Sequence, residues 1–403
     1  MIRPGRVGSP MIRRSISLPN DLSRRGFLAG ATGAAAGWAP RLTAQCAGES
    51  TVSNLAQMVD TRLMQDMAAY RIPSVSYAVL GCQGIRVARA LGVLRAGQNV
   101  AATRNTLFQA ASISKTVAAV TALRLVQDGK LALDEPVDSM LKSWKLPPGR
   151  QSPAWPVTLR RLLGMTAGVN IHGFGGYQEG ELQPNPVQIL EGKRPANSPP
   201  VRVMNRPGSQ QLYSGGGYQI AEMLMHDATG QRYADLAASL VFAPLKMTNS
   251  HFDHPLPARL AASAAEGHNN MGVPLPGRWH NYPELAAAGL WTTPTDLGLL
   301  CSGLSRSWLT NRGFLRQDLV KEMMTRVDRF SYGLGGAVSP PGMEVAFSKS
   351  GDNAGYKCTM VFFPQTGEGM AIMTNGDQGE RIFARAVQIV ATGLHWPRYG
   401  LGG

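Results

Sequence analysis

A serine and a lysine three residues apart constrain the fold and chemistry of this chain more than any other feature. They stand in Ser112-Ile-Ser-Lys115, at the start of a segment whose apolar residues recur at helical spacing until Asp128-Gly129. Side chains at positions i and i+3 of a helix lie on one face, one turn apart. A desolvated lysine beside a serine eases the removal of the hydroxyl proton. The pattern therefore predicts a buried helix whose first turn carries a nucleophile.

The spacing itself is common, and the chain contains a second match in Ser139-Met-Leu-Lys142. That match follows Asp134-Glu-Pro136 and is typical of an ordinary turn of a surface helix. Two further elements distinguish the first match. Tyr213-Ser-Gly215 precedes another helical segment, and Lys349-Ser-Gly351 lies in a strand pattern and is the only Lys-[Ser/Thr]-Gly in the chain. Three such elements, in this order and widely separated, rarely occur together by chance.

The order of these elements resembles the serine β-lactamase-related family, which includes class C β-lactamases, D-alanyl-D-alanine carboxypeptidases and esterases of a penicillin-binding-protein-like fold. In that family Ser-x-x-Lys is followed by Tyr-x-Asn and then by Lys-Thr-Gly or a histidine variant. Further segments are similar to family elements, namely Leu162–Gly168, Phe242–Thr248, Gly289–Leu297 and Met373–Gly376. The resemblance covers roughly residues 50–395 and implies an α+β fold of the β-lactamase/transpeptidase type.

The periodicity of apolar residues favours the same fold class. Helical patterns occur near both ends, at about 53–70 and 379–393. Strand patterns also occur near both ends, at 74–80, 85–91, 329–337, 343–350 and 356–375. The middle of the chain is helical, with long loops rich in proline and glycine. This arrangement predicts an antiparallel sheet built from both termini and flanked by helices, with an inserted, mainly helical lobe.

The expected domain from 45 to 403 therefore has two lobes. We expect a sheet lobe over about 45–125 and 316–403 and a helical lobe over about 126–315. The helix that begins near Ser112 would lie at their junction, where a cleft is expected.

The first 44 residues are predicted to be an export signal. Ser23-Arg-Arg-Gly-Phe-Leu28 precedes an apolar run over 29–39, which is the pattern of a twin-arginine signal peptide. Cleavage after Ala44 fits the preference for a small residue at that position. The alternative of an uncleaved membrane anchor is disfavoured because the run is short and rich in glycine. We therefore expect a periplasmic or secreted protein with no stable membrane span after cleavage.

Composition narrows the range of partners. The net charge is +14, but residues 1–44 alone carry seven arginines and one aspartate, and the remainder contains no Lys/Arg run. This pattern disfavours nucleic acid as a partner, whereas the family resemblance implies a small-molecule or peptidoglycan-derived substrate. His-Glu-x-x-His, Gly-x-Ser-x-Gly and P-loop motifs are absent, so we expect no metal and no cofactor.

The cysteines leave the redox state open. Cys46, Cys82, Cys301 and Cys358 show no Cys-x-x-Cys spacing. In an exported protein four cysteines allow three pairings, and the sequence favours none of them over buried free thiols. The oligomeric state is equally open.

The family resemblance implies roles for the three elements. Ser112 is the expected nucleophile, and Lys115 lowers the cost of removing its proton. Tyr213 is the expected general base and acid, because two neighbouring lysines would lower the pKa of its phenol. Lys349 supplies the second of these charges and can hold a substrate carboxylate.

The strand that carries the third element is expected to bind the substrate. The expected substrate-binding residues are Lys349, Ser350, Gly351 and Asp352. By resemblance, the main-chain N–H groups of Ser112 and Asp352 would form an oxyanion hole, in which each donor contributes about 3–4 kcal/mol.

The chain also departs from the family pattern. Tyr-x-Asn is replaced by Tyr213-Ser-Gly215, so no side-chain amide is available there to orient a substrate amide. The third element carries Lys349 where many relatives carry histidine. No Glu-x-x-Leu-Asn follows, so deacylation would have to use Tyr213.

The sequence thus predicts an exported serine hydrolase that acts through an acyl-enzyme. Three substrate classes compete: β-lactams, D-amino-acid peptides of the cell wall, and small esters. The alternative is a binding protein of the same fold with a degraded site, and the presence of all the expected catalytic residues argues against it.

Overall fold

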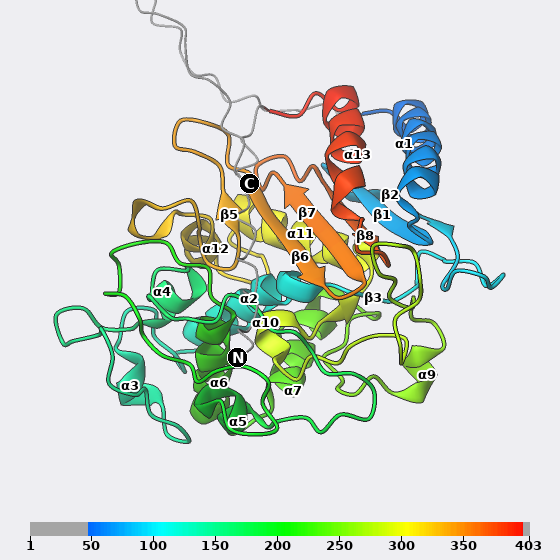
Figure 1. Ribbon diagram of the computed structural model, residues 1–403. Coiled ribbons are helices and arrows are strands. Elements are labelled where there is room, and N and C mark those ends of the chain that lie inside the picture. Colours follow the sequence, from blue (N-terminus) through cyan, green and yellow to red (C-terminus); the bar gives the residue numbers. More distant parts are fainter. Residues whose placement is uncertain (1–46, 398–403) are drawn as a thin grey trace, which may run out of the picture. The chain divides into compact units, whose positions relative to one another are not determined.

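The computed structural model describes residues 47–397 (Figure 1). The predicted signal peptide and Cys46 lie outside the described residues. Within 47–397, no helix combines the length and the apolar character needed to cross a membrane.

A six-stranded antiparallel sheet joins the two ends of the described chain. Its strand order is β2-β1-β8-β7-β6-β5. The early hairpin therefore pairs with strands that follow almost 300 residues later, and Val75 of β1 lies opposite Thr374 of β8. The strands are β1 Ser74–Gly81, β2 Gly84–Gly92, β5 Ala337–Val338, β6 Phe347–Asn353, β7 Tyr356–Phe362 and β8 Gly369–Thr374. This topology confirms the predicted antiparallel sheet built from both termini.

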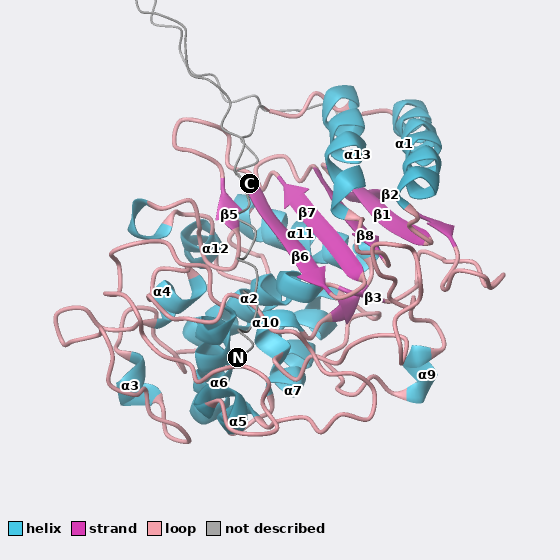
Figure 2. Ribbon diagram, in the orientation of Figure 1, coloured by secondary structure: helices cyan, strands magenta, loops and turns pink. Residues whose placement is uncertain are grey.

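Helices cover both faces of this sheet (Figure 2). Helices α1 (Glu49–Tyr70) and α13 (Glu380–Gly393) pack side by side on one face. In α13 the buried residues recur at i, i+4 and i+8, which is the apolar stripe of a helix lying on a core. Helix α11 (Pro294–Leu309) contacts β1, β2 and β8.

The segment between β2 and β5 contains mainly helices. At its centre is α2 (Ser114–Gln127), which the prediction assigns almost entirely to the sheet lobe. It is buried along nearly its whole length and contacts α6 and α10. The other elements, including a short sheet, are β3 Phe108–Gln109, η1 Ala111–Ile113, α3 Val137–Met140, α4 Leu159–Leu163, α5 Pro186–Glu191, α6 Gly215–Thr229, α7 Tyr233–Ala237, η2 Ala238–Phe242, α8 Ala243–Leu245, α9 Ala258–Ala261, α10 Leu285–Ala288, β4 Trp291–Thr292, α12 Gln317–Met323 and η3 Val327–Arg329. The limits of the two lobes stay a prediction.

One predicted strand is wrong. The segment 329–337 contributes only Ala337 to β5, and its first residue, Arg329, is the last residue of the 3₁₀ turn η3. Asp328 and Arg329 have φ angles of 48° and 73°, and Gly335 has a φ of 91°. Such left-handed conformations interrupt an extended strand. The next predicted strand, 343–350, is displaced, because β6 begins at Phe347 and continues to Asn353.

Candidate active site

Ser112 lies in the 3₁₀ turn η1, which leads directly into α2. The preceding residue, Ala111, is fully buried and has a φ of 46°, in the left-handed region that costs an L-residue about 1–2 kcal/mol. Ser114 holds this turn in place, because its hydroxyl donates to Ala111 O (2.5 Å) and accepts from Leu290 N (3.0 Å). The serine is therefore presented by a strained turn that its surroundings fix.

Lys115 lies one turn beyond Ser112 and is almost completely buried. Its Nζ donates to Ser112 Oγ (2.9 Å) and to Ala287 O (2.7 Å). Burial is the largest influence on the pKa of Lys115 and lowers it, and the positive charge of the nearby Lys349 lowers it further. These two influences outweigh the attraction of Tyr213, so the pKa falls to about 8. A lysine in this state stabilises a serine oxygen that is losing its proton.

The second Ser-x-x-Lys match has a different environment. Ser139 lies in the one-turn helix α3, where its hydroxyl donates to Pro136 O (2.7 Å). The ammonium of Lys142 donates to Asp227 O (3.0 Å). Each side chain thus has a local structural partner.

Tyr213, just before α6, lies between two ammonium groups. Lys115 Nζ is 5.2 Å and Lys349 Nζ is 5.0 Å from the centre of its ring. Burial alone would raise the pKa of this phenol, but the two positive charges and hydrogen bonds with Ser112 and Lys349 together lower it to about 7. A phenol with such a pKa can exchange a proton with a serine near neutral pH.

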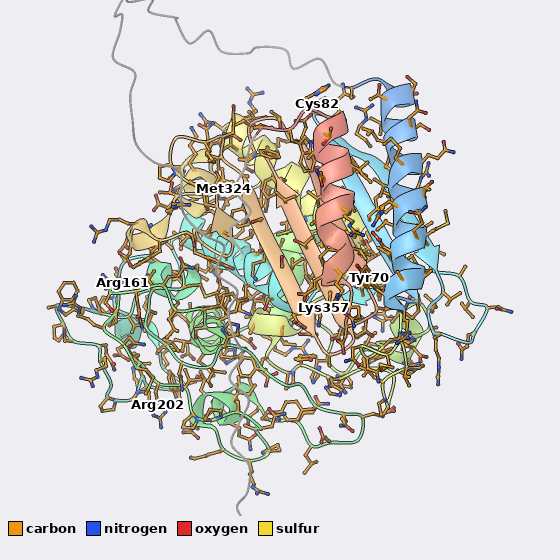
Figure 3. The ribbon with its side chains drawn as sticks, turned by 45° about the horizontal axis from the view of Figure 1, so that its top comes forward. Tyr70, Cys82, Arg161, Arg202, Met324 and Lys357 are labelled. Carbon is orange, nitrogen blue, oxygen red and sulfur yellow. The ribbon has the colours of Figure 1, made fainter. Side chains whose placement is uncertain are left out.

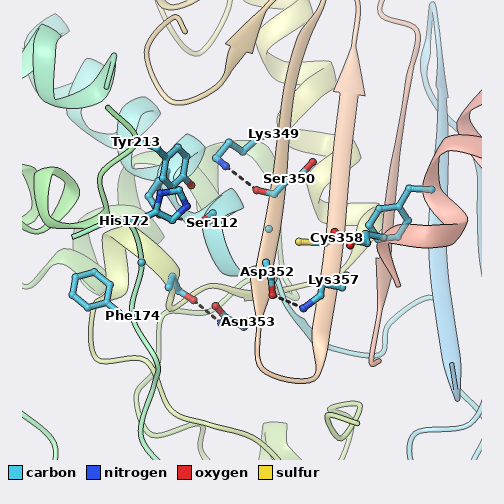
Figure 4. A pocket seen from close by; sticks show the side chains of 16 residues that line it. Ser112, His172, Phe174, Tyr213, Lys349, Ser350, Asp352, Asn353, Lys357 and Cys358 are labelled. Atoms are coloured by element: carbon cyan, nitrogen blue, oxygen red, sulfur yellow. Dashed lines mark hydrogen bonds and ion pairs between the residues drawn. The ribbon is translucent and has the colours of Figure 1, made fainter. Parts of the chain in front are cut away.

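Lys349 extends from β6 toward Tyr213 (Figure 4). It is buried, and its Nζ donates to Ser350 O (2.7 Å). Burial would lower the pKa of this lysine, but the negative character of Tyr213 and Tyr332 outweighs burial and raises it. Lys349 therefore stays charged.

Gly351 allows β6 to approach the turn that carries Ser112. A Cβ on Gly351 would meet Ala110 O at 2.3 Å and Cys358 Sγ at 2.6 Å. These distances leave no space for a side chain, so the glycine of the third element is required by close packing.

The direction of the Asp352 N–H follows from the hairpin. Asn353 and Tyr356 pair across a two-residue turn between β6 and β7. Because the bonded pairs alternate along an antiparallel ladder, the N–H groups of Ser350 and Asp352 point away from β7. Both residues line the cavity that contains Ser112. The Asp352 side chain is exposed and forms an ion pair with Lys357.

Gly351→Ala is expected to destabilise the protein and reduce its activity. The added methyl must move β6 away from Ala110, and overpacking of this kind costs about 1–3 kcal/mol. Chemical unfolding measures the stability loss. Gly48→Ala is the matched control, because a Cβ at Gly48 would meet no atom within 4 Å. An unchanged free energy of unfolding in Gly351→Ala would contradict the close approach of the strand.

These residues line one cavity of about 380 Å³ (Figure 4). Tyr213 and His172 stand on one wall, opposite Lys349 on β6. The complete lining is Ser112, Lys115, His172, Gly173, Phe174, Tyr213, Ala288, Lys349, Ser350, Gly351, Asp352, Asn353, Lys357, Cys358, Glu380 and Phe383. The structure thus brings together all seven residues that the sequence singles out.

Sequence reasoning missed the aromatic wall of this cavity. The His172 ring lies 4.7 Å from the Tyr213 ring, centre to centre. Phe174 follows in the same loop, and a Cβ on Gly215 would lie only 2.9 Å from its Cε2. Phe174 therefore fills space beside the position where relatives carry asparagine. The loop follows the family-like segment 162–168, which is the only sequence signal that could have pointed to it.

Asn353, at the end of β6, was also missed. Its Nδ2 donates to Gln109 Oε1 (2.8 Å) and to Ala288 O (3.2 Å). These bonds tie the end of β6 to β3 and to α10, whose Ala287 carbonyl holds Lys115. The only sequence signal was its position two residues after the Lys-Ser-Gly element.

Two cysteines are free and one is bonded. Cys301 and Cys358 are buried free thiols. Cys82, in the turn between β1 and β2 (Figure 3), is disulfide-bonded. Among residues 47–397, no group of three or more His, Cys, Asp or Glu side chains is arranged to hold a metal ion.

Comparisons with known proteins converge on one family. The family model described as Beta-lactamase matches residues 59–393. Protein flp of Staphylococcus aureus (strain COL) is 22% identical over 244 residues, which are 59% of this chain and 45% of that protein. Esterase EstB of Burkholderia gladioli is 31% identical over 189 residues, which are 43% of this chain and 47% of EstB. Each match thus spans less than half of the relative.

Solved structures show the same fold. The octameric penicillin-binding protein homologue from Pyrococcus abyssi aligns with a TM-score of 0.64 and 20% identity, over 84% of this chain and 77% of that one. The D-alanine carboxypeptidase AmpC from Burkholderia cenocepacia aligns with a TM-score of 0.67 and 19% identity, over 85% of this chain and 99% of that one. These likenesses confirm the predicted fold class.

Proposed function

Because the chain belongs to the beta-lactamase family, we propose that it is an exported serine hydrolase that works through an acyl-enzyme on Ser112. One observation carries this proposal: the Ser112 hydroxyl lies 2.9 Å from a buried lysine and beside a phenol whose pKa is lowered to about 7. A screen with nitrocefin, p-nitrophenyl esters and D-Ala-D-Ala peptides tests it. Turnover of none of these substrates, together with no labelling by a penicillin probe, would instead favour the degraded binding protein.

The geometry supports a two-step reaction. Tyr213 as phenolate accepts the Ser112 proton while Ser112 Oγ attacks the substrate carbonyl, and the adjacent Lys115 ammonium stabilises the developing charge. The N–H groups of Ser112 and Asp352 would hold the oxyanion. Tyr213 then gives its proton to the leaving group. In the second step it accepts a proton from water while the water oxygen bonds to the acyl carbon. The bond from the acyl carbon to Ser112 Oγ then breaks, the acid product leaves, and Tyr213 returns the proton to Ser112 Oγ.

Among the competing substrate classes we favour short-chain esters. Gly215 offers no side-chain amide, and Phe174 occupies the adjacent space. A substrate amide therefore meets an apolar ring in place of a hydrogen-bond donor. An activated ester depends less on such a contact, because its leaving group is better. The esterase among the curated relatives supports this choice, whereas the Lys349 charge favours β-lactams with a carboxylate.

Short p-nitrophenyl esters are therefore expected to be hydrolysed with a higher kcat/KM than nitrocefin. The double variant Phe174→Ala/Gly215→Asn frees the space and restores the amide, and it should narrow this gap by up to about tenfold, the value of one hydrogen bond. Phe174→Ala alone is the control for the added volume. Efficient nitrocefin turnover by the native protein, with no detectable esterase activity, would reverse the ranking and favour a true β-lactamase.

Export by the twin-arginine route is expected to depend on Arg24 and Arg25. A receptor reads this pair as an address, so Arg24→Lys/Arg25→Lys keeps the charge but should leave the precursor in the cytoplasm. Cell fractionation and immunoblotting measure the distribution, with Arg13→Lys/Arg14→Lys as the matched control. An unchanged periplasmic yield of the first variant would show that another route is used.

A further inference from the structure

A second cavity, of about 440 Å³, lies among α5, α6, α7 and α10, which supply most of its lining residues. Figure 1 shows α5, α6 and α7 grouped there. Most of its lining surface is apolar and comes from side chains such as Val187, Met223 and Leu285. The complete lining is Ser143, Asn185, Pro186, Val187, Glu222, Met223, His226, Arg232, Tyr233 and Leu285. No described residue lines both this cavity and the one that contains Ser112.

One carboxyl group, that of Glu222, stands in the buried wall of this cavity. Glu222 is 4% exposed, and its Oε2 accepts from Ala286 N (2.9 Å) and from Gln219 Nε2 (3.0 Å). Its Oε1 receives no hydrogen bond from the described residues. Behind this wall, Gln219 Oε1 and both carboxyl oxygens of Glu284 are buried without a partner, but neither residue lines the cavity. The hydroxyl of Tyr233, which does line it, is also buried without a partner. An unpartnered buried acceptor costs about 1–3 kcal/mol, and Glu222 Oε1 is the carboxyl oxygen of this group that belongs to a residue lining the cavity.

The charged residues of the cavity do not donate to Glu222 Oε1. Arg232, the only arginine or lysine in the lining, is exposed and donates twice to Asp235 (2.8 Å each). His226 is near the surface, with its Nδ1 2.9 Å from Gln231 O. Burial raises the pKa of Glu222 to about 7, and burial together with the charge of Glu222 raises the pKa of Glu284 to about 8. A cation placed beside Glu222 would favour its ionised form.

We propose that this cavity is a second binding site, which takes a small apolar amine whose ammonium group donates to the Glu222 carboxylate. The apolar walls accommodate a hydrocarbon body, and the Glu222 carboxylate accepts from the ammonium head group. An alcohol would supply one donor without the charge, and a fatty acid would add a further negative group. The amine is therefore the class that best completes this site.

Occupancy of this site is linked to the catalytic lysine through α10. Glu222 holds Ala286 N, and the carbonyl of the next residue, Ala287, accepts from Lys115 Nζ (2.7 Å). Helix α10 has only four residues and contacts both α2 and α6. A ligand that displaces the Glu222 carboxylate is therefore expected to displace the Ala287 carbonyl, which orients Lys115. We expect the amine to change kcat in a saturable way.

Binding is tested first in the Ser112→Ala variant, so that the result does not depend on catalysis or on the proposed function. Calorimetric titration with n-hexylamine, 1-hexanol and hexanoate compares three compounds that share a six-carbon chain and differ in the polar head group. We expect hexylamine to bind saturably and about tenfold more tightly than the other two. Glu222→Gln should weaken the binding of hexylamine by about tenfold. The matched control is Glu368→Gln, which changes a half-buried carboxyl on the β7–β8 hairpin.

A second variant keeps the test independent of the buried carboxylate. Val187→Trp fills the cavity from α5 and should abolish hexylamine binding, while thermal unfolding verifies that each variant is folded. In the enzyme with Ser112 intact, the change in kcat with hexylamine should disappear in Val187→Trp. The absence of hexylamine binding would overturn the proposal, as would equal binding in folded Glu222→Gln or Val187→Trp. If hexanol bound as tightly as hexylamine, the cavity would be a purely hydrophobic site, and the proposed amine site would be ruled out.

Discussion

Ser112→Ala is expected to abolish hydrolysis and covalent labelling, whereas Ser139→Ala leaves both unchanged. Both serines stand three residues before a lysine. The two variants therefore test whether the Ser-x-x-Lys spacing alone is sufficient or whether the structural environment of Ser112 is needed. Only Ser112 lies on a strained buried turn and within 2.9 Å of a buried lysine. Ser139 is exposed to solvent and bonded to Pro136 O.

The loss in Ser112→Ala should exceed about 10³-fold in kcat, because without the hydroxyl no acyl-enzyme can form. Labelling with a fluorescent penicillin or an activated ester, followed by mass spectrometry of the peptide, measures the covalent step. Ser112 lines the cavity, so the smaller side chain leaves no closed void, and thermal stability should stay close to that of the native protein. Labelling of Ser112→Ala at full stoichiometry would show that Ser112 is not the nucleophile.

The parts of the site that could be predicted are those whose chemistry is local in sequence. One turn of helix is enough to place Lys115 beside Ser112. Alternation and the Lys-Ser-Gly element were enough to place Lys349 on a strand. A single antiparallel sheet built from both ends of the chain was also predictable, because strand patterns occur at both ends with helices between them. Which early strand pairs with which late strand was not predicted.

The parts that could not be predicted depend on contacts between distant segments. Phe174 and His172 lie in a loop without periodicity, and only the fold places them beside Gly215 and Tyr213. Glu222 occurs on α6 as one polar residue in an apolar run, and nothing in its neighbours shows that it meets Ala286. The segment 329–337 was mistaken for a strand, because sequence patterns do not report the positive φ angles that interrupt it.

Replacing Tyr213 is expected to have the second largest effect on catalysis. Tyr213→Phe removes the phenolic oxygen but keeps the ring against His172, and loss of a general base and acid lowers kcat by about 10²–10⁴-fold. Because only the phenolate accepts the Ser112 proton, kcat/KM in the native protein should rise with pH through the Tyr213 pKa of about 7. Tyr213→Phe should lose this dependence together with the rate.

Lys349→Met tests the origin of that pKa. Lys349 Nζ lies 5.0 Å from the Tyr213 ring, and its charge is one of the influences that hold the phenol pKa down against burial. Removing the charge raises the pKa of Tyr213, so the rise in kcat/KM should move to higher pH. Lys357→Met is the control, because Lys357 lines the same cavity but pairs with Asp352 and Asp377. Its pH profile should keep its midpoint. A midpoint that stays in place in Lys349→Met would assign the titration to another group, with Lys115 as the first alternative.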